Sequence, residues 1–170
     1  MDNVATSKTD GVQEAFAITI ANEGPAAWVE RSVVLPGSND EFVFGVRPEF
    51  RAHYGVSEDQ FPSRPTTNDV FAAAVASCMT GTFIGALESR GLTLTADSAR
   101  ASVAVDMGPA GADRVSVIRS IDVTFHVSVP EEARAMVERV HGFYDKACWL
   151  SQTLVGSRCK VTSAVRFEEA

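Results

Sequence analysis

Apolar and polar residues alternate along three stretches of the N-terminal third, and this alternation is typical of β-strands. The stretches cover residues 15–19, 26–35 and 41–46. A Pro-Gly-Ser-Asn-Asp turn at residues 36–40 separates the last two, which favours an antiparallel meander. Residues 47–65 contain three prolines and one glycine without a clean period, so we expect an irregular loop with room for one short helical turn.

A long helix is predicted over residues 70–90. Cap-type residues at 66–69 (Thr-Thr-Asn-Asp) precede it, and Gly91 ends it. Small residues dominate this segment, and Gly81 and Gly85 within it cost about 1 kcal/mol each relative to alanine. Close approach of another element would explain the two glycines, so we expect a central, buried helix.

Strand and helix patterns alternate in the second half of the chain. Residues 92–105 and 115–129 alternate like strands on either side of a Gly-Pro-Ala-Gly turn at 108–111. Pro130 and the two glutamates after it open a second helix, because proline and acidic side chains suit the first helical turn. A short helix over 149–155 and a strand over 160–167 complete the predicted elements.

This order of elements predicts an α+β fold with antiparallel sheets and two long helices. The chain has 170 residues, of which 45% are hydrophobic, and this suits one globular domain with a substantial core. We therefore expect a flexible tail over residues 1–14 and a single domain over residues 15–170.

Charge and hydropathy argue against two classes of partner. The chain carries 22 acidic and 15 basic residues, a net charge of -7, which disfavours binding to nucleic acid. The longest apolar run, residues 70–78, is too short to span a membrane. The N-terminus lacks the basic start and apolar stretch of a signal peptide. We expect a cytoplasmic protein without a membrane partner.

The three cysteines, at 78, 148 and 159, are too sparse for a secreted disulfide framework and too scattered for a zinc site. Cys78 lies beyond the first turn of its helix, where the helix dipole no longer acidifies a thiol, so its reactivity would need a cation from elsewhere. Cys148 follows the second helix, and we expect it to be more accessible than Cys78. Cys159 shares a strand face with apolar residues, which indicates a buried structural thiol. Inert, buried thiols remain the alternative for all three.

Two segments resemble the OsmC/Ohr family of organic hydroperoxide-reducing proteins. Residues 66–78 (TTNDVFAAAVASC) resemble the family's P-E-x-L-x-A-A-x-A-x-C helix. Residues 144–154 (YDKACWLSQTL) are similar to its second motif, in which Pro-Val and then a Ser-x-x-Leu-like run usually follow the cysteine. The two segments occur in the family's order, the final strand also fits, and the resemblance covers residues 15–168.

The resemblance implies a two-cysteine, thiol-dependent peroxidase with an OsmC-like fold, built as an intertwined homodimer. Cys78 matches the position that attacks the hydroperoxide, and Cys148 matches the resolving position. The sulfenic acid formed on the first thiol is captured by the second as a disulfide. A dithiol, either a lipoyl group or a small thiol, reduces that disulfide. The resemblance implies no metal, haem or flavin cofactor.

The chain departs from the family pattern at two positions. Asn68 stands where the family has the glutamate of its Pro-Glu pair, and the adjacent Asp69 could replace that carboxylate or complete the helix cap. Trp149 stands where the family has proline after the resolving cysteine. The family's activating arginine comes from the N-terminal half, where we favour Arg47 and Arg31 from a set that also holds Arg51 and Arg64.

Helical spacing places Phe71 and Val75 on the face of Cys78, and Phe143 and Trp149 flank Cys148. If the cysteines meet, these four side chains would form one small apolar cavity for an organic hydroperoxide. Two other functions remain open. A non-catalytic dimeric module could bind a small ligand in a pocket formed by Phe71, Phe83, Phe143 and Trp149, or a thiol sensor could use the same cysteines in slow disulfide exchange.

Overall fold

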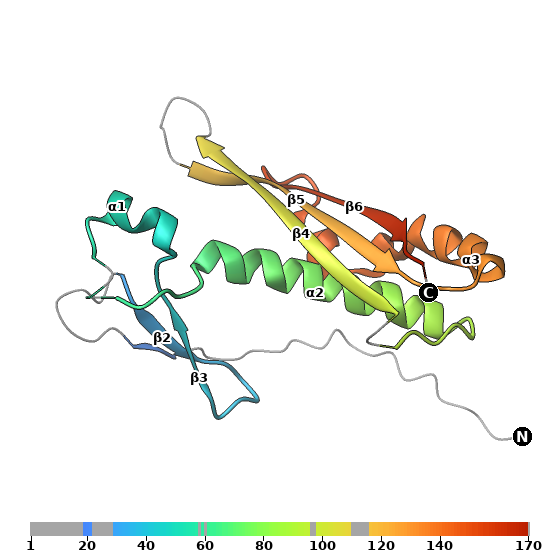
Figure 1. Ribbon diagram of the computed structural model, residues 1–170, viewed down its shortest axis with the longest axis horizontal. Coiled ribbons are helices and arrows are strands. Elements are labelled where there is room, and N and C mark those ends of the chain that lie inside the picture. The colour runs from blue at the N-terminus through green and yellow to red at the C-terminus, as the bar shows by residue number, and fades with distance from the viewer. Residues whose placement is uncertain are drawn as a thin grey trace, which may run out of the picture. The chain divides into compact units, whose positions relative to one another are not determined.

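The computed structural model describes residues 19–21, 29–57, 59, 61–95, 98–109 and 116–169. The chain divides into two compact units, Met1–Thr66 and Thr67–Ala170, which are coloured blue to cyan and green to red in Figure 1. The tail expected over residues 1–14 lies outside the described residues, and the single domain expected over residues 15–170 stays a prediction.

The first unit contains the expected antiparallel meander. Its strands are β1 (Thr19–Ala21), β2 (Arg31–Val34) and β3 (Glu41–Phe44), in the order β1-β2-β3. Both neighbouring pairs are antiparallel. Gly37 adopts a positive φ of 78° in the turn between β2 and β3, a conformation that glycine reaches without strain. The irregular segment after β3 contains the expected helical turn, formed by η1 (Pro48–Phe50) and α1 (Arg51–Tyr54).

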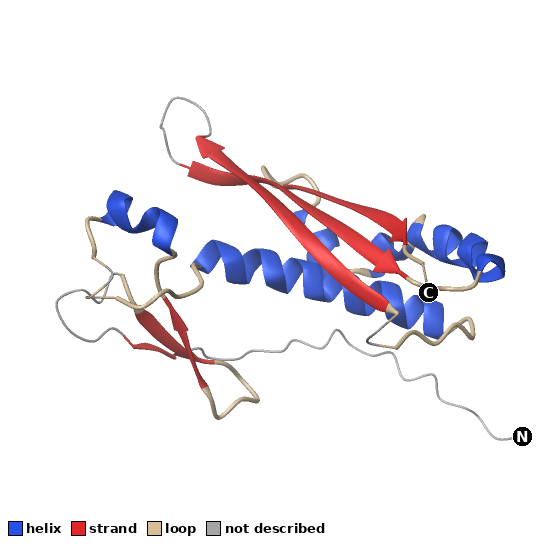
Figure 2. Cartoon of the chain, in the orientation of Figure 1, coloured by secondary structure: helices blue, strands red, loops and turns tan. Residues whose placement is uncertain are grey.

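The second unit packs helices against one face of a three-stranded sheet (Figure 2). The sheet has the order β4-β5-β6. The helix α2 contacts β4 and β5, and α3 contacts β6. The elements are α2 (Thr67–Glu88), β4 (Ala99–Pro109), β5 (Ser116–Val127), α3 (Glu131–His141), η2 (Tyr144–Ala147), α4 (Trp149–Leu154) and β6 (Lys160–Phe167).

One strand pair differs from the antiparallel arrangement predicted. β4 and β5 are antiparallel, but β5 and β6 are parallel, with Ile121 opposite Val161 and Val127 opposite Phe167. Parallel neighbours need a long crossover connection, and α3, η2 and α4 supply it. This crossover returns the chain across the helical face of the sheet and brings residues 144–154 beside α2.

The strand predicted over residues 92–105 was wrong at both ends, because β4 runs over Ala99–Pro109. Leu92 and Leu94 alternate with exposed threonines because they pack on the core from a loop rather than from a strand. The turn predicted at 108–111 was placed too early in the chain. Gly108 and Pro109 still belong to β4 and pair with β5, beyond a shift of register at Asp106/Met107.

The core of the second unit is built around a group of stacked aromatic rings. Phe83 of α2 is 1% exposed, and its ring stacks on Phe125 of β5 with centroids 4.5 Å apart. Tyr144 of η2 contacts Phe83 edge-on at 5.3 Å and Phe125 at 5.5 Å. Three elements distant in sequence therefore meet at one point. The other α2 side chains buried there follow helical spacing: Ala72, Val75, Ala76, Met79 and Leu87.

Within the described part of one chain α2 is buried on one side only, whereas the sequence indicated a central, buried helix. A Cβ atom at Gly81 or Gly85 would meet nothing within 4 Å among the described residues, so the close approach expected there is absent. Ala73, Ser77 and these two glycines instead line an open groove of about 560 Å³ with residues of β4.

By length and composition α2 is also the one described helix that could cross a membrane, whereas its apolar run over residues 70–78 is too short to suggest a span. Core helices of globular proteins meet the same criterion. Val75, Phe83 and Leu87 of this helix are fully buried in the core of the second unit, which accounts for its apolar composition.

We expect Phe83→Ala to lower the free energy of unfolding by about 3–5 kcal/mol, because it removes a buried ring that contacts two others. Phe71→Ala on the same helix is the matched control, since the Phe71 side chain is exposed. Urea denaturation monitored by circular dichroism would measure both. Equal effects of the two substitutions would contradict the assigned core.

Candidate functional site

The crossover brings two of the three cysteines into contact. Cys78 lies in the middle of α2, and Cys148 is the N-cap residue of α4. The Sγ atoms are 3.4 Å apart. A disulfide requires about 2.05 Å between sulfurs, so a small shift of either side chain would allow the bond to form. Both thiols are free in the structure.

The exposure of the two thiols is the reverse of what the sequence suggested. Cys148 is 0% exposed, whereas Cys78 is half-buried. The prediction that Cys148 would be the more accessible was wrong because η2 and α4 fold onto α2, so that the thiol at the helix end points into the core. A reagent from solvent therefore reaches Cys78 first.

Burial raises the pKa of the Cys148 thiol above its ordinary value. The backbone N–H of Ser151 acts in the opposite direction, as does the Thr82 hydroxyl, while the Cys78 thiol adds to the rise. Cys148 is therefore protonated at neutral pH, and its thiol donates a hydrogen bond to the Cys78 sulfur. In this arrangement Cys78 is the acceptor, as a nucleophilic sulfur would be.

Thr82 is a residue of this site that sequence reasoning missed. It lies one helical turn after Cys78, and its hydroxyl donates to the Cys78 carbonyl oxygen at 2.9 Å. That bond holds the threonine side chain against the helix, beside Cys148. The i, i+4 spacing from Cys78 was the available signal.

A buried polar cluster adjoins the thiols. The Tyr144 hydroxyl donates to Ser163 Oγ at 2.8 Å, and His141 Nε2 lies 3.0 Å from the same oxygen. Burial raises the pKa of Tyr144 to about 12 and lowers that of His141. Both side chains are therefore uncharged at neutral pH. They line a cavity of about 230 Å³ together with Met79 and Ser151.

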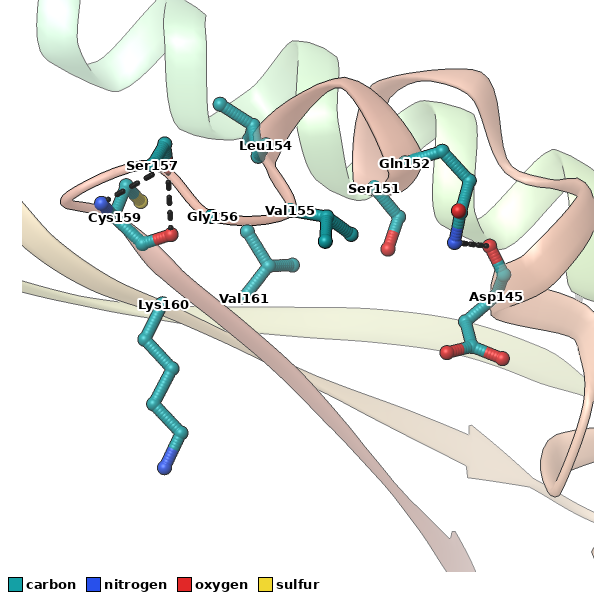
Figure 3. A pocket seen from close by; sticks show the side chains of 10 residues that line it. All are labelled: Asp145, Ser151, Gln152, Leu154, Val155, Gly156, Ser157, Cys159, Lys160 and Val161. Carbon is teal, nitrogen blue, oxygen red and sulfur yellow. Dashed lines mark hydrogen bonds between the residues drawn. The ribbon is translucent and has the colours of Figure 1, made fainter.

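A second cavity of about 320 Å³ lies between the α4 region and β6 (Figure 3). Asp145 and Ser151 line both cavities. Figure 3 shows the Gln152 amide directed at the Asp145 carbonyl oxygen, 3.1 Å away, with Lys160 on the opposite side. The lining is mixed and charged, unlike the apolar cavity that the sequence suggested.

The side chains expected to form that apolar cavity do not converge within the second unit. Trp149 is 84% exposed and Phe71 is 40% exposed, so neither is enclosed. Val75 is fully buried in the core. Phe143 is half-buried beneath the Arg90 guanidinium, which lies 4.9 Å from the ring centroid.

The chain is similar to known proteins in sequence pattern and in fold. A family model described as OsmC-like protein matches residues 59–164, well over half of the chain. The chain belongs to the OsmC family. No curated protein matches it significantly by sequence.

Solved OsmC-like structures share the fold of this chain at low sequence identity. An OsmC-like protein from Mycoplasma pneumoniae has a TM-score of 0.67 at 15% identity, over 91% of this chain and 98% of its own. An OsmC-like protein of unknown function from Vibrio cholerae has a TM-score of 0.69 at 10% identity, over 90% and 99%. The organic hydroperoxide resistance protein OhrB of Bacillus subtilis has a TM-score of 0.58 at 16% identity, over 89% and 98%.

The arginines considered for the OsmC activating position all lie in the first unit. Arg47 forms an ion pair with Glu49 at 3.3 Å and lies over the Phe50 ring. Arg64 lies 4.0 Å from Glu30, and Arg51 donates to the Phe61 carbonyl oxygen at 3.0 Å. Arg31 is the first residue of β2.

The carboxylate and amide at the start of α2 lie in its first turn. Asp69 is half-buried there, where a negative charge suits the helix dipole. The Asn68 amide is 3.7 Å from Met107 Sδ. Among the described residues no three His, Cys, Asp or Glu side chains are grouped closely enough to hold a metal ion.

Cys159 lies outside the thiol pair, directly before β6. It is half-buried, and its backbone N–H donates to Ser157 Oγ at 3.1 Å. Burial raises the pKa of the Cys159 thiol, and the charge of Asp122 raises it further. This sulfur is therefore a poor nucleophile at neutral pH.

Stoichiometric oxidation with diamide should form one disulfide, between Cys78 and Cys148, because only these sulfurs are in contact. Intact mass spectrometry should show the loss of two hydrogen atoms, and peptide mapping should find Cys159 still open to alkylation. Cys159→Ser is the control and should form the same bond. A disulfide that includes Cys159 would contradict the assigned pair.

Proposed function

We propose that this OsmC family protein reduces organic hydroperoxides, with Cys78 as the attacking thiol and Cys148 as the resolving thiol. The observation that carries the proposal is the 3.4 Å contact between a half-buried and a fully buried sulfur. The attacking thiol has to meet a substrate from solvent, whereas the resolving thiol has to meet only its partner.

The reaction proceeds in three balanced steps. The Cys78 thiolate attacks the outer peroxide oxygen, the O–O bond breaks, and the alcohol leaves with a proton, which forms a sulfenic acid on Cys78. The Cys148 sulfur then attacks the Cys78 sulfur, and water leaves as the disulfide forms. An external dithiol, a lipoyl group or a small thiol, reduces the disulfide by exchange and is itself oxidised.

Cys78 needs a cation and a carboxylate in this proposal, and the family resemblance implies that the cation is an arginine of the N-terminal half. Arg47 and Arg31 are the favoured activators, since a guanidinium stays charged when buried and offers several donors to a thiolate and a peroxide oxygen together. Asp69 supplies the carboxylate next to Asn68, which occupies the family's glutamate position.

A homodimer is part of the same proposal, because α2 leaves one side open. A second copy of the chain could cover the groove formed by Ala73, Ser77, Gly81 and Gly85 with β4. In that assembly Phe71, Phe143 and Trp149 would contribute the apolar surface for the organic part of the substrate, whereas Val75 stays in the core. We propose a cytoplasmic protein with no nucleic-acid or membrane partner.

The raised pKa of Cys148 favours a second candidate function, a thiol sensor. A protonated resolving thiol attacks slowly, because the thiolate is the nucleophile. The sensor and the peroxidase differ in turnover. The sensor accepts one equivalent of hydroperoxide and stays oxidised, whereas the peroxidase consumes many equivalents when a dithiol is supplied.

Hydroperoxide consumption with dihydrolipoamide as reductant tests the proposal. We expect kcat/KM for cumene hydroperoxide to exceed that for hydrogen peroxide by about tenfold or more, since buried apolar groups of a ligand each contribute about 0.8 kcal/mol. Cys78→Ser should abolish consumption. Cys148→Ser should permit one oxidation and then stop, and dimedone should trap the sulfenic acid.

Cys159→Ser is the matched control and should keep the full rate. Loss of activity in Cys159→Ser together with full activity in Cys148→Ser would overturn the thiol assignment. Equal efficiency for the two peroxides would overturn the apolar substrate surface.

Substitution of Arg31, Arg47, Arg51 and Arg64 by methionine, one at a time, tests the activating cation. We expect one variant to lose about tenfold or more in the rate at which iodoacetamide alkylates Cys78, because a lost ion pair lowers the thiolate fraction at neutral pH. The other three arginine variants serve as controls for folding and net charge. Four equal rates would leave the peroxidase proposal without its activator.

A further inference from the structure

Three polar side chains form a hydrogen-bonded chain on the face of the β4-β5-β6 sheet opposite the helices. Ser102 of β4 lies 2.8 Å from His126 Nε2 through its Oγ atom. His126 Nδ1 lies 3.0 Å from Glu168 Oε1, directly after β6. His126 projects away from the core because its neighbours in β5, Phe125 and Val127, face the helices.

The carboxylate fixes the protonation of the imidazole. Burial acts to raise the pKa of Glu168, but hydrogen bonds and charges from Arg100 and His126 outweigh it and hold the pKa below its ordinary value. An ionised carboxylate only accepts hydrogen bonds, so His126 Nδ1 must carry the proton that lies between them. In the neutral ring Nε2 is then a lone-pair acceptor, and Ser102 donates its hydroxyl proton to it.

The three groups are held in place before any ligand binds. His126 is 8% exposed, and its ring is fixed at both nitrogens. The Glu168 backbone N–H donates to the Val127 carbonyl oxygen at 3.0 Å, and its carboxylate also pairs with Arg100. Ser102 is exposed and belongs to the edge strand of the described sheet. The hydroxyl is therefore accessible while the base behind it is shielded.

We propose that Ser102, His126 and Glu168 form a second reactive site that hydrolyses small carboxylic esters. The arrangement has the order nucleophile, base and orienting carboxylate that acyl transfer requires. It is separate from the thiol pair, since Cys78 and Cys148 belong to the core on the helical face of the sheet.

The hydrolysis proceeds in two stages, acylation of Ser102 and release of the acyl group by water. Ser102 Oγ attacks the ester carbonyl carbon while its proton passes to His126 Nε2, and Glu168 stabilises the imidazolium. The alcohol leaves with that proton, and an acyl group remains on Ser102. Water then attacks the acyl carbon, gives up one proton through His126, and releases the carboxylic acid. The serine is regenerated without an oxidant or a reductant.

The surroundings of Ser102 define the substrate class. The register places Thr124 of β5 beside Ser102, and Ala164 of β6 lies beyond Thr124. These small side chains form no deep apolar pocket for a long acyl chain among the described residues of the sheet. Arg166 is opposite His126 in β6, on the same face of the sheet, and no carboxylate pairs with it within residues 98–109 and 116–169. This free guanidinium favours the negative charge that develops on the carbonyl oxygen. Short acyl esters therefore fit the site.

Labelling of the full-length protein with a fluorophosphonate probe, followed by peptide mapping, tests the nucleophile. We expect Ser102 to be labelled, and no label on Ser102→Ala. Glu168→Gln should reduce the rate of labelling by about tenfold or more, because the base loses its orienting charge. Ser120→Ala is the matched control. Ser120 is on the same face of β5 as His126 but donates a hydrogen bond to Asp122, so in this variant Ser102 should be labelled at the original rate.

Ester turnover is measured with p-nitrophenyl acetate in a triple variant that carries Cys78→Ser, Cys148→Ser and Cys159→Ser. This variant has no thiols, so the cysteines cannot hydrolyse the ester. We expect Ser102→Ala in that background to lower the rate to that of the unfolded chain, and p-nitrophenyl octanoate to react more slowly than the acetate. Circular dichroism checks that each variant is folded. The proposal would be overturned if Ser102 carried no label. It would also be overturned if the Glu168→Gln variant were folded and its Ser102 were labelled at the full rate.

Discussion

The burial of Tyr144 against Phe83 and Phe125 is the contact on which the candidate site depends. The three rings come from η2, α2 and β5, and each is almost fully buried. The Tyr144 hydroxyl reaches Ser163 of β6, so its polar end is also satisfied inside the core. Because Tyr144 is anchored to both a helix and the sheet, the next turn of chain is held beside α2, where Cys148 contacts Cys78.

This contact anchors a segment of mixed composition. Residues 144–154 combine the polar Asp145, Lys146 and Gln152 with an exposed Trp149. Tyr144 and Cys148 are the fully buried side chains of the segment, and they lie four residues apart. Leu150 and Leu154 also pack on the core, and the other residues of the segment line cavities or face solvent.

The alternation and helix signals predicted most of the elements, because burial on one face leaves a periodic pattern in the sequence. The strand over residues 160–167 and the helices beginning near Thr67, Glu131 and Trp149 were all visible in this way. The parallel pairing of β6 was not, since strand direction depends on where the crossover returns rather than on the strand's own residues. Leu92 and Leu94 misled the prediction because a loop that packs on a core alternates like a strand.

The candidate site was only partly predictable for a similar reason. The motif placed Cys78 and Cys148 in the same site, but the exposure of each depends on how η2 and α4 fold onto α2, which is a tertiary effect. Thr82 and Ser151 affect Cys148 through hydroxyl and backbone contacts that depend on how the segments fold together. The small residues of α2 suggested close approach by another element, and no described residue of the chain makes that approach at Gly81 or Gly85.

The parallel β5–β6 pair has a consequence for the order of events during folding. Every contact in that pair joins residues about forty positions apart, as Ser120 and Lys160 do. Its formation therefore carries a larger loop-closure entropy than the first contacts of the β4–β5 hairpin, where Pro109 pairs with Ser116. The hairpin and α2 can associate first, while the crossover is still being placed. Cys148 reaches its partner only in this late, non-local step. During synthesis on the ribosome, Cys78 therefore emerges and enters its helix well before the thiol that later covers it has been translated.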